Sequence, residues 1–369
     1  MFSLDTETGF DKIVLINAAW GLGENVVQGA VDPDEYQVYK PFLGNKELVP
    51  IVRKALGAKM IKMIYDERPG ATVRNVPTSR AERAAFVLKD DEILDLARAA
   101  ESIERHYGLP MDMEWARDGK DGPLYIVQAR PETVQSRTGS DSMRSYSLRE
   151  TGEALISGLS VGNSVASGEV CLIEHVEDID RFVDGSVLVT STTDPDWVPI
   201  MKRAAAIVTD HGGRTSHAAI VSRELGVPAI VGTSRATQIF HDGQFVTVSC
   251  AGGDEGIVYE GRAKVDVEET NISKIPATKT RVMVNVANPS AASRWWRLPV
   301  DGVGLARMEF VINNEIKVHP LALTRYEELG DDLVKDEIDR LTKGFDSREQ
   351  FFIQRLSEGL SRLACTWYP

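Results

Sequence analysis

The chain has 369 residues, enough for two or three domains, and its 43% apolar and 26% charged content is typical of a soluble globular protein. A net charge of −13 argues against nucleic acid and membrane surfaces as partners, because both are anionic and would repel it. No apolar run could span a bilayer and the first ten residues do not form a signal peptide, so we expect a cytoplasmic location.

The N-terminal third contains one helix and one hairpin signal. Apolar residues recur at helical spacing from Asp90 to Ile103, and Gly108 ends the run. The segment MDMEWARDGKDGPLYIVQARP, at 111–131, alternates on both sides of a turn rich in Asp and Gly, which predicts a β-hairpin. Upstream, the glycines of WGLGENVVQG could cradle a phosphate, although an ordinary turn explains them equally well.

The predicted hairpin places polar side chains in pairs. Asp112 and Glu114 share one face of the first strand, and Gln128 and Arg130 share one face of the second. Paired carboxylates suit Mg²⁺, and an arginine beside them suits the phosphates that the metal bridges. The alternative is a solvated polar face, which half-exposed hairpins normally have.

The middle of the chain predicts an α/β domain between two linkers. Residues 135–150 are polar, and residues 262–280 are charged and poor in strand signals, so we expect a linker in each place. Between them the order strand, helix, strand, helix, strand indicates at least partly parallel pairing. Beyond them, RVMVNVA and GVGLA predict strands, and Asp346 opens a helix with a D-x-x-E capping box that ends near Leu363.

The stretch GGRTSHAAI, at 212–220, is the strongest chemical signal. Its two glycines allow a tight turn, and His217 should lie in the first turn of the helix that follows, where free N–H groups and the helix dipole favour an anion. Arg214 and the hydroxyls of Thr215 and Ser216 add donors, and a neutral imidazole is a good nucleophile. A phosphohistidine is therefore chemically reasonable, although a lone histidine is more often a surface or core residue.

The longer run TDHGGRTSHAAIVSRELGVPAIVGT, at 209–233, resembles the phosphohistidine signature of the phosphoenolpyruvate (PEP) synthases and related PEP-utilising enzymes, and His217 falls on the phosphorylated histidine. INAAWGLGENVVQGAVDPDEYQVYKP and the hairpin resemble the end of the family's nucleotide-binding domain, and VMVNVANPSAASRWWRLPVDGVGLARMEFVINNEIKVHP resembles the start of its PEP/pyruvate-binding barrel. The resemblance implies an α/β multidomain chain. Its expected parts are a partial ATP-grasp-like domain (1–134), a linker (135–152), a swivelling phosphohistidine domain (153–262), a linker (263–280) and a truncated TIM-barrel start (281–369).

The resemblance also implies roles for individual residues. It gives Glu114 as a metal ligand, and Gln128 and Arg130 as contacts of the nucleotide phosphates. It gives Arg307 as the substrate contact and Thr215 as the target of a regulatory kinase and phosphorylase. The local patterns described above add Asp112 to the metal ligands and add Arg214 and, on weaker grounds, Glu24 to the phosphate and nucleotide contacts. The expected ligands are Mg²⁺, ATP as a substrate, and pyruvate or PEP. The resemblance also allows a second copy of the full-length protein as a partner, in a homodimer.

The implied reaction converts ATP, pyruvate and water into AMP, PEP and phosphate. In the family, the histidine attacks the β-phosphorus, the terminal phosphate is hydrolysed, and the remaining phosphoryl group passes to pyruvate. Family members are about twice as long, so we expect this chain to be a fragment that does not complete the cycle alone. Two alternatives stay open, a pyruvate phosphate dikinase, which uses phosphate instead of water, and a stand-alone phosphohistidine carrier.

Overall fold

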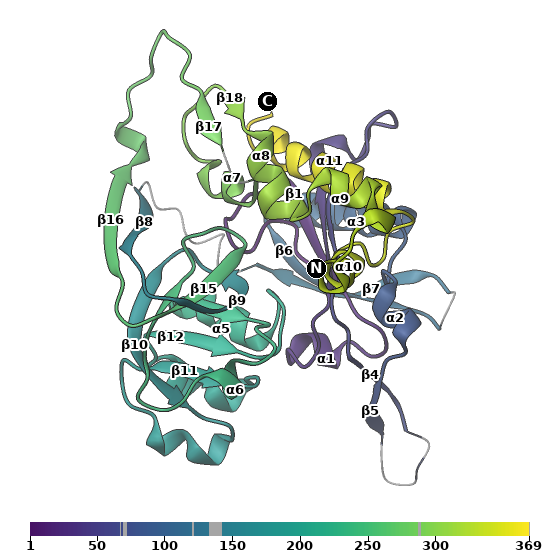
Figure 1. Cartoon of the computed structure of the whole chain (residues 1–369). Helices are drawn as coiled ribbons and strands as arrows, with labels where there is room; N and C mark the ends of the chain where they lie inside the picture. Colours follow the sequence, from purple (N-terminus) through teal and green to yellow (C-terminus); the bar gives the residue numbers. More distant parts are fainter. Residues whose placement is uncertain (67, 69–71, 120–121, 133–141, 287–288, 369) are drawn as a thin grey trace.

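A computed structural model of the chain describes residues 1–66, 68, 72–119, 122–132, 142–286 and 289–368. Figure 1 shows an N-terminal part of strands and helices, a β-barrel beside it, and a mainly helical C-terminal part that lies against the N-terminal strands. We call residues 153–262 the barrel domain. The α/β multidomain class predicted from the sequence is confirmed.

The N-terminal part is an antiparallel sheet covered by one long helix. Phe2 forms bridges to Leu15 and Asp112, and so joins the three-stranded sheet β1-β2-β3 to the hairpin β6–β7. Helix α3 ends at Gly108, which is left-handed with φ of 71°, as the sequence predicted. The elements are β1 (Ile13–Ala18), α1 (Glu24–Val27), β2 (Asp34–Tyr39), β3 (Ile51–Ala55), β4 (Ile61–Tyr65), β5 (Val73–Pro77), α2 (Arg80–Ala84), α3 (Asp90–Tyr107), β6 (Met111–Arg117) and β7 (Leu124–Pro131).

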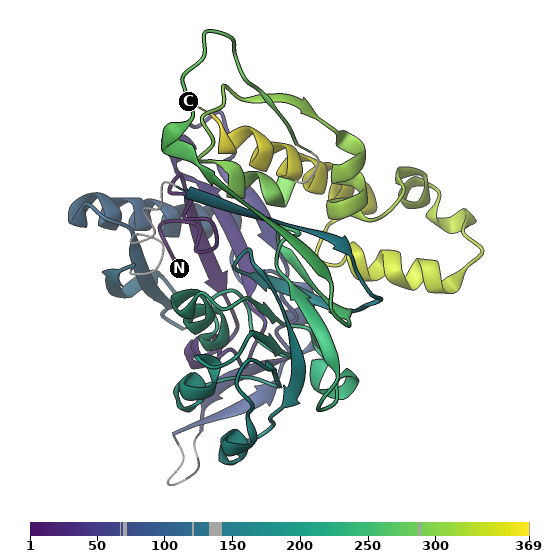
Figure 2. The same cartoon turned by 90° about the vertical axis from the view of Figure 1, so that its left-hand side faces the viewer.

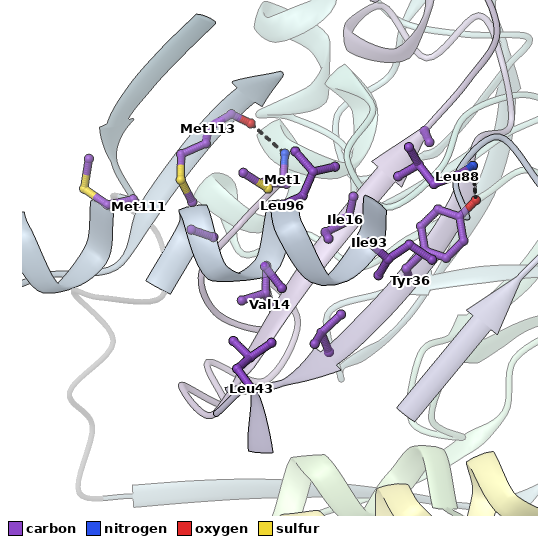
Figure 3. Close-up of a cluster of buried hydrophobic side chains, with 14 residues drawn as sticks. Met1, Val14, Ile16, Tyr36, Leu43, Leu88, Ile93, Leu96, Met111 and Met113 are labelled. Atoms are coloured by element: carbon purple, nitrogen blue, oxygen red, sulfur yellow. Dashed lines mark hydrogen bonds between the residues drawn. The ribbon is translucent and has the colours of Figure 1, made fainter. Parts of the chain in front are cut away.

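The core of this part lies between α3 and the sheet. Figure 3 shows Ile93 and Leu96 of α3 packed toward Val14 and Ile16 of β1, and all four side chains are buried. Burying apolar side chains of this size contributes about 1.5–3 kcal/mol each. This packing holds the hairpin β6–β7 in place, because Met113 on its inner face belongs to the same cluster.

A buried ion pair fixes the turn between β3 and β4 to the start of β2. Lys59 and Asp34 are both fully buried and paired. The Asp34 carboxylate also accepts hydrogen bonds from the backbone N–H groups of Gly57 and Val87, each at 2.8 Å. A buried charge is tolerated when its hydrogen-bonding capacity is used in this way.

The barrel domain closes seven strands in the order β10-β11-β12-β13-β9-β15-β14. Strands β10 to β13 are parallel to one another and the other pairs are antiparallel, so the predicted partly parallel pairing is confirmed. Buried valines and isoleucines fill its interior, while α4 and α5 cover its outside with a second apolar cluster. The elements are β9 (Ala154–Val161), β10 (Val165–Leu172), β11 (Val187–Thr190), α4 (Val198–Met201), β12 (Ala206–Thr209), α5 (His217–Leu225), β13 (Ala229–Val231), α6 (Ala236–Ile239), β14 (Phe245–Ser249) and β15 (Glu255–Glu260).

The segments that enter and leave the barrel domain form a β-ribbon, which corrects the prediction that residues 262–280 are poor in strands. Strand β8 (Ser142–Glu150) pairs antiparallel with β16 (Lys264–Asn271) along eight positions, and Figure 1 shows this ribbon beside the barrel. Cross-strand ion pairs join Arg144 to Glu269, Arg149 to Asp266 and Lys264 to Glu150. Opposite charges facing each other stabilise a two-stranded ladder that single segments do not reveal. Residues 135–141 of the predicted first linker lie outside the described residues.

The C-terminal part begins with a strand–helix–strand unit. Its strands β17 and β18 are parallel, as in an α/β fold. The long helix predicted from Asp346 is present, but Ser347 is its N-cap and accepts a hydrogen bond from the N–H of Gln350 at 3.1 Å, so the start shifts by one residue. The elements are β17 (Val284–Val286), α7 (Pro289–Ala292), β18 (Val303–Ala306), α8 (Met308–Val311), α9 (Pro320–Thr324), α10 (Asp332–Leu341) and α11 (Arg348–Thr366).

Helix α11 attaches the C-terminal part to the N-terminal sheet. Cys365 packs in a buried cluster with Tyr39 and Val52, and Arg355 donates a hydrogen bond to the carbonyl oxygen of Lys54 at 2.8 Å. Figure 2 shows α11, in yellow, near the N-terminal strands, in purple. We call the N- and C-terminal parts together the body. Within the described ranges, no helix has the length and apolar content needed to cross a membrane.

Candidate functional site

His217 is the first residue of α5, as the sequence predicted. Strand β12 ends at Thr209, and the chain then turns through Gly212, whose φ of 113° suits only glycine among the common residues. Ser216 is the N-cap, and its side chain makes no capping hydrogen bond. The helix therefore presents N–H groups beside the imidazole, an arrangement suited to an anion.

A threonine that follows the neighbouring strand β11 contacts the imidazole. Oγ1 of Thr193 lies 3.0 Å from Nδ1 of His217, and the threonine is almost fully buried. Burial lowers the pKa of His217 below its ordinary value of 6.5, against the opposing effect of Asp194 and Glu224. The neutral form of the imidazole therefore dominates at pH 7, and the Thr193 contact distinguishes its two nitrogens.

The three residues before His217 differ in what they offer to a phosphate. Arg214, predicted as a phosphate contact, turns away and pairs with Asp254 at 2.7 Å. The hydroxyls of Thr215 and Ser216 are buried and, in the described part of the chain, have no hydrogen-bond partner. In this arrangement a phosphate could draw on these two hydroxyls and on the N–H groups of the helix N-terminus. The Arg214 guanidinium is paired with Asp254 instead.

The glycine segment of the body lies directly against the histidine loop. A Cβ on Gly29 would lie 2.6 Å from Cβ of Ser216, so the two backbones meet at a distance that requires glycine. Oγ1 of Thr192 donates to the carbonyl oxygen of Gln28 at 3.3 Å, and the N–H of Gly212 donates to the Asp32 carboxylate at 3.0 Å. Burial raises the pKa of Asp32, although the bond from Gly212 lowers it.

Glu24, predicted on weaker grounds as a nucleotide contact, starts α1 in this segment. It is exposed, and its carboxylate accepts a hydrogen bond from the side chain of Gln28 at 2.8 Å. The predicted glycine segment is thus close to the predicted histidine, and the sequence did not indicate that they would touch.

The hairpin brings its four predicted polar residues onto one face. Asp112 is opposite Arg130 in the register, and Glu114 is opposite Gln128. Arg130 donates to Asp112 from two nitrogens, at 2.8 and 2.9 Å. Glu114, Gln128 and Arg130 are exposed, so the shared face predicted from the alternation is confirmed.

A metal would need further ligands at this hairpin. The described residues contain no cluster of three or more His, Cys, Asp or Glu side chains arranged to hold an ion. Two carboxylates are nonetheless compatible with Mg²⁺, which commonly takes one or two protein carboxylates and completes its shell with water and substrate phosphates. The hairpin therefore fits a metal that arrives with a nucleotide.

Arg307 follows β18 directly, at the carboxyl end of that strand. Its side chain is exposed, and its backbone N–H points to the carbonyl oxygen of Val286 on the neighbouring strand at 3.5 Å. Carboxyl ends of parallel strands are where α/β folds place ligand contacts.

Sequence reasoning missed Thr193 and Asp32. Thr193 follows β11, and β11 pairs in parallel with β12, which leads to the histidine loop. Because parallel strands end at the same edge of a sheet, a polar residue after one strand is a candidate partner for a residue after the next. Asp32 had no such signal, because it comes from another part of the chain.

Comparison with known proteins gives two family matches. Residues 1–150 match the model "Pyruvate phosphate dikinase, AMP/ATP-binding domain", and residues 182–253 match "PEP-utilising enzyme, mobile domain". The whole chain is 50% identical to phosphoenolpyruvate synthases of Synechocystis sp. and Pseudomonas aeruginosa and 47% identical to that of Escherichia coli, covering 46%, 47% and 46% of those proteins. The chain thus spans about half the length of the curated relatives it matches.

Proposed function

Because the chain belongs to the family of PEP-utilising dikinases, we propose that it serves the phosphoenolpyruvate synthase reaction, with His217 as the phosphoryl carrier. The observation that supports this most directly is the placement of His217 at the start of α5, with Nδ1 on Thr193. The overall conversion is ATP, pyruvate and water to AMP, PEP and phosphate. The names of the relatives favour water, rather than phosphate, as the second acceptor.

The geometry suggests which ring nitrogen reacts. When Nδ1–H donates a hydrogen bond to Oγ1 of Thr193, the lone pair of Nε2 is free to attack the β-phosphorus. The Nε2–P bond forms as the bond between the β-phosphorus and the oxygen bridging to the α-phosphate breaks, and that oxygen leaves with AMP. Hydrolysis then removes the terminal phosphate, and the remaining phosphoryl group transfers from Nε2 to the enolate oxygen of pyruvate.

The nucleotide is proposed to lie on an ATP-grasp-like N-terminal domain. Asp112 and Glu114 would hold Mg²⁺, which neutralises the charge of the phosphates when bound. Gln128 and Arg130 would then contact phosphate oxygens, which requires Arg130 to divide its donors between the nucleotide and Asp112. Glu24 is proposed as a further nucleotide contact from the glycine segment.

The substrate is proposed to bind at the C-terminal part, as the beginning of a TIM barrel. Arg307 at the end of β18 would pair with the carboxylate or phosphate of pyruvate or PEP. Since one histidine serves both the nucleotide and this substrate, the barrel domain is proposed to move between two sites. The ribbon β8–β16 is its connection to the body.

Thr215 is proposed as the residue on which a regulatory kinase and phosphorylase act. Its hydroxyl is buried in the present arrangement, so modification requires a rearrangement that exposes it. A phosphate two residues before His217 would introduce negative charge where the phosphoryl group must arrive.

The test is labelling of the chain by ³²P-labelled PEP in the presence of an intact relative. We expect an acid-labile, base-stable label that is absent from His217→Ala and retained by His175→Ala, a control for an exposed histidine of the same domain. Equal labelling of parent and His217→Ala would reject the assignment.

A further inference from the structure

One carboxylate of the barrel domain contacts arginines from three segments of the chain. Asp254, in the turn between β14 and β15, lies 2.7 Å from Arg214 of the histidine loop. It also lies 2.5 Å from Arg53 of β3 and 2.7 Å from Arg362 of α11. Burial alone would raise the pKa of Asp254, but the three guanidinium groups hold it well below its usual value.

Each arginine also has a carboxylate within its own part of the molecule. Arg53 lies 3.8 Å from Glu35 on the adjacent strand, and both belong to the body. Arg362 lies 3.6 Å from Glu315, also in the body. Arg214 and Asp254 both belong to the barrel domain and would move together.

We propose that Asp254 is a clasp that docks the barrel domain on the body and sets the ratio of docked to released molecules. The inference rests on the proposed carrier function, which requires the barrel domain to leave the body. Removing one partner of a buried ion pair is strongly unfavourable, because it leaves an uncompensated charge. Here release divides the network into three neutral pairs, Arg53–Glu35, Arg362–Glu315 and Arg214–Asp254.

This arrangement makes two carboxylates of one network act in opposite directions. Asp254 attracts the body arginines only in the docked position, so its removal favours release. Glu35 matters more after release, when it is the carboxylate that stays beside Arg53, so its removal favours docking. An ion-pair network with a merely structural role would be weakened by both changes.

The experiment measures the distance between the barrel domain and the body in the unphosphorylated chain without nucleotide. Ser102→Cys on α3 and Glu177→Cys in the barrel domain provide exposed positions for a fluorophore pair, while Cys171, Cys250 and Cys365 are buried. The sodium chloride concentration is raised to about 1 M, where the Debye length is about 3 Å and attraction between charges is strongly screened. The salt concentration at which half of the molecules are released is compared among variants.

We expect Asp254→Asn to lower the docked-to-released ratio about tenfold or more, because three partly buried cations lose their shared anion. Glu35→Gln should raise the ratio about two- to fivefold, since its 3.8 Å pair is weaker. The matched controls are Asp184→Asn and Glu337→Gln, which remove carboxylates from exposed ion pairs outside the clasp, and they should leave the ratio unchanged.

The proposal is overturned by shifts of the same sign in Asp254→Asn and Glu35→Gln, by values equal to the parent in both, or by a parent that stays docked throughout the salt range. Circular dichroism of each variant verifies that the barrel and sheet remain folded. Because the readout is a distance in the absence of phosphoryl donors, it is independent of whether His217 accepts label.

Discussion

Replacing Thr193 by valine removes the hydroxyl beside Nδ1 of His217 and nearly preserves the shape of the side chain. The contact is 3.0 Å long between neutral groups, and a hydrogen bond of this kind contributes about 0.5–1.5 kcal/mol. His217 is only half-buried, so water can partly replace the partner, and the loss should fall within that range. Since about 1.4 kcal/mol is tenfold in rate, we expect labelling to slow about two- to tenfold.

The assay is the initial rate of His217 labelling at saturating donor. The maximal rate should fall while the donor concentration at half-saturation stays unchanged, because the Thr193 contact orients the imidazole rather than the donor. Thr193→Ser keeps the hydroxyl and should recover most of the rate. A valine variant that labels as fast as the parent would refute the orienting role, and a serine variant as slow as valine would attribute the loss to packing.

Three further predictions follow from burial and close contact. Burial lowers the pKa of His217, so the neutral nucleophile accumulates as pH rises and the labelling rate should reach half its plateau below pH 6.5, measured across a pH series. Gly29→Ala places a Cβ 2.6 Å from Cβ of Ser216 across the docked contact, and this overpacking should favour release of the barrel domain in the paired-label distance measurement by about 1–3 kcal/mol. Lys59→Met leaves its buried aspartate partner unpaired and should lower the free energy of unfolding in urea by about 3–5 kcal/mol, whereas Lys264→Met in an exposed pair should cost less than about 1 kcal/mol.

Local patterns in the sequence predicted the elements that carry the candidate site. The glycine turn and helical spacing placed His217 at the start of α5, because both signals lie within one short segment. The alternation around 111–131 predicted the hairpin, and the register pairs Asp112 with Arg130 and Glu114 with Gln128. Side-chain direction alternates along a strand, so the shared face followed from spacing alone.

Contacts between distant segments were beyond the same reasoning. The strands of the ribbon are separated by more than one hundred residues, and only their pairing shows that Arg149 meets Asp266. Arg214 looked like a phosphate ligand because its neighbours in sequence suit an anion, yet its guanidinium is bound by Asp254. The sequence is equally compatible with a phosphate or a carboxylate as the partner of an arginine, and only the fold shows which of them is close.

The docked arrangement links the modification of Thr215 to the position of the barrel domain. The threonine hydroxyl and the adjacent Ser216 are buried, and Gly29 of the body lies against that serine. A modifying enzyme that needs the hydroxyl acts only on molecules in which it is exposed, and we expect release of the barrel domain to open this loop at the contact between Ser216 and Gly29. Whatever acts on one state of an equilibrium draws molecules toward that state. The ion pairs of Asp254 are with arginines. We therefore expect Asp254 to change the accessibility of Thr215 through the docked-to-released ratio.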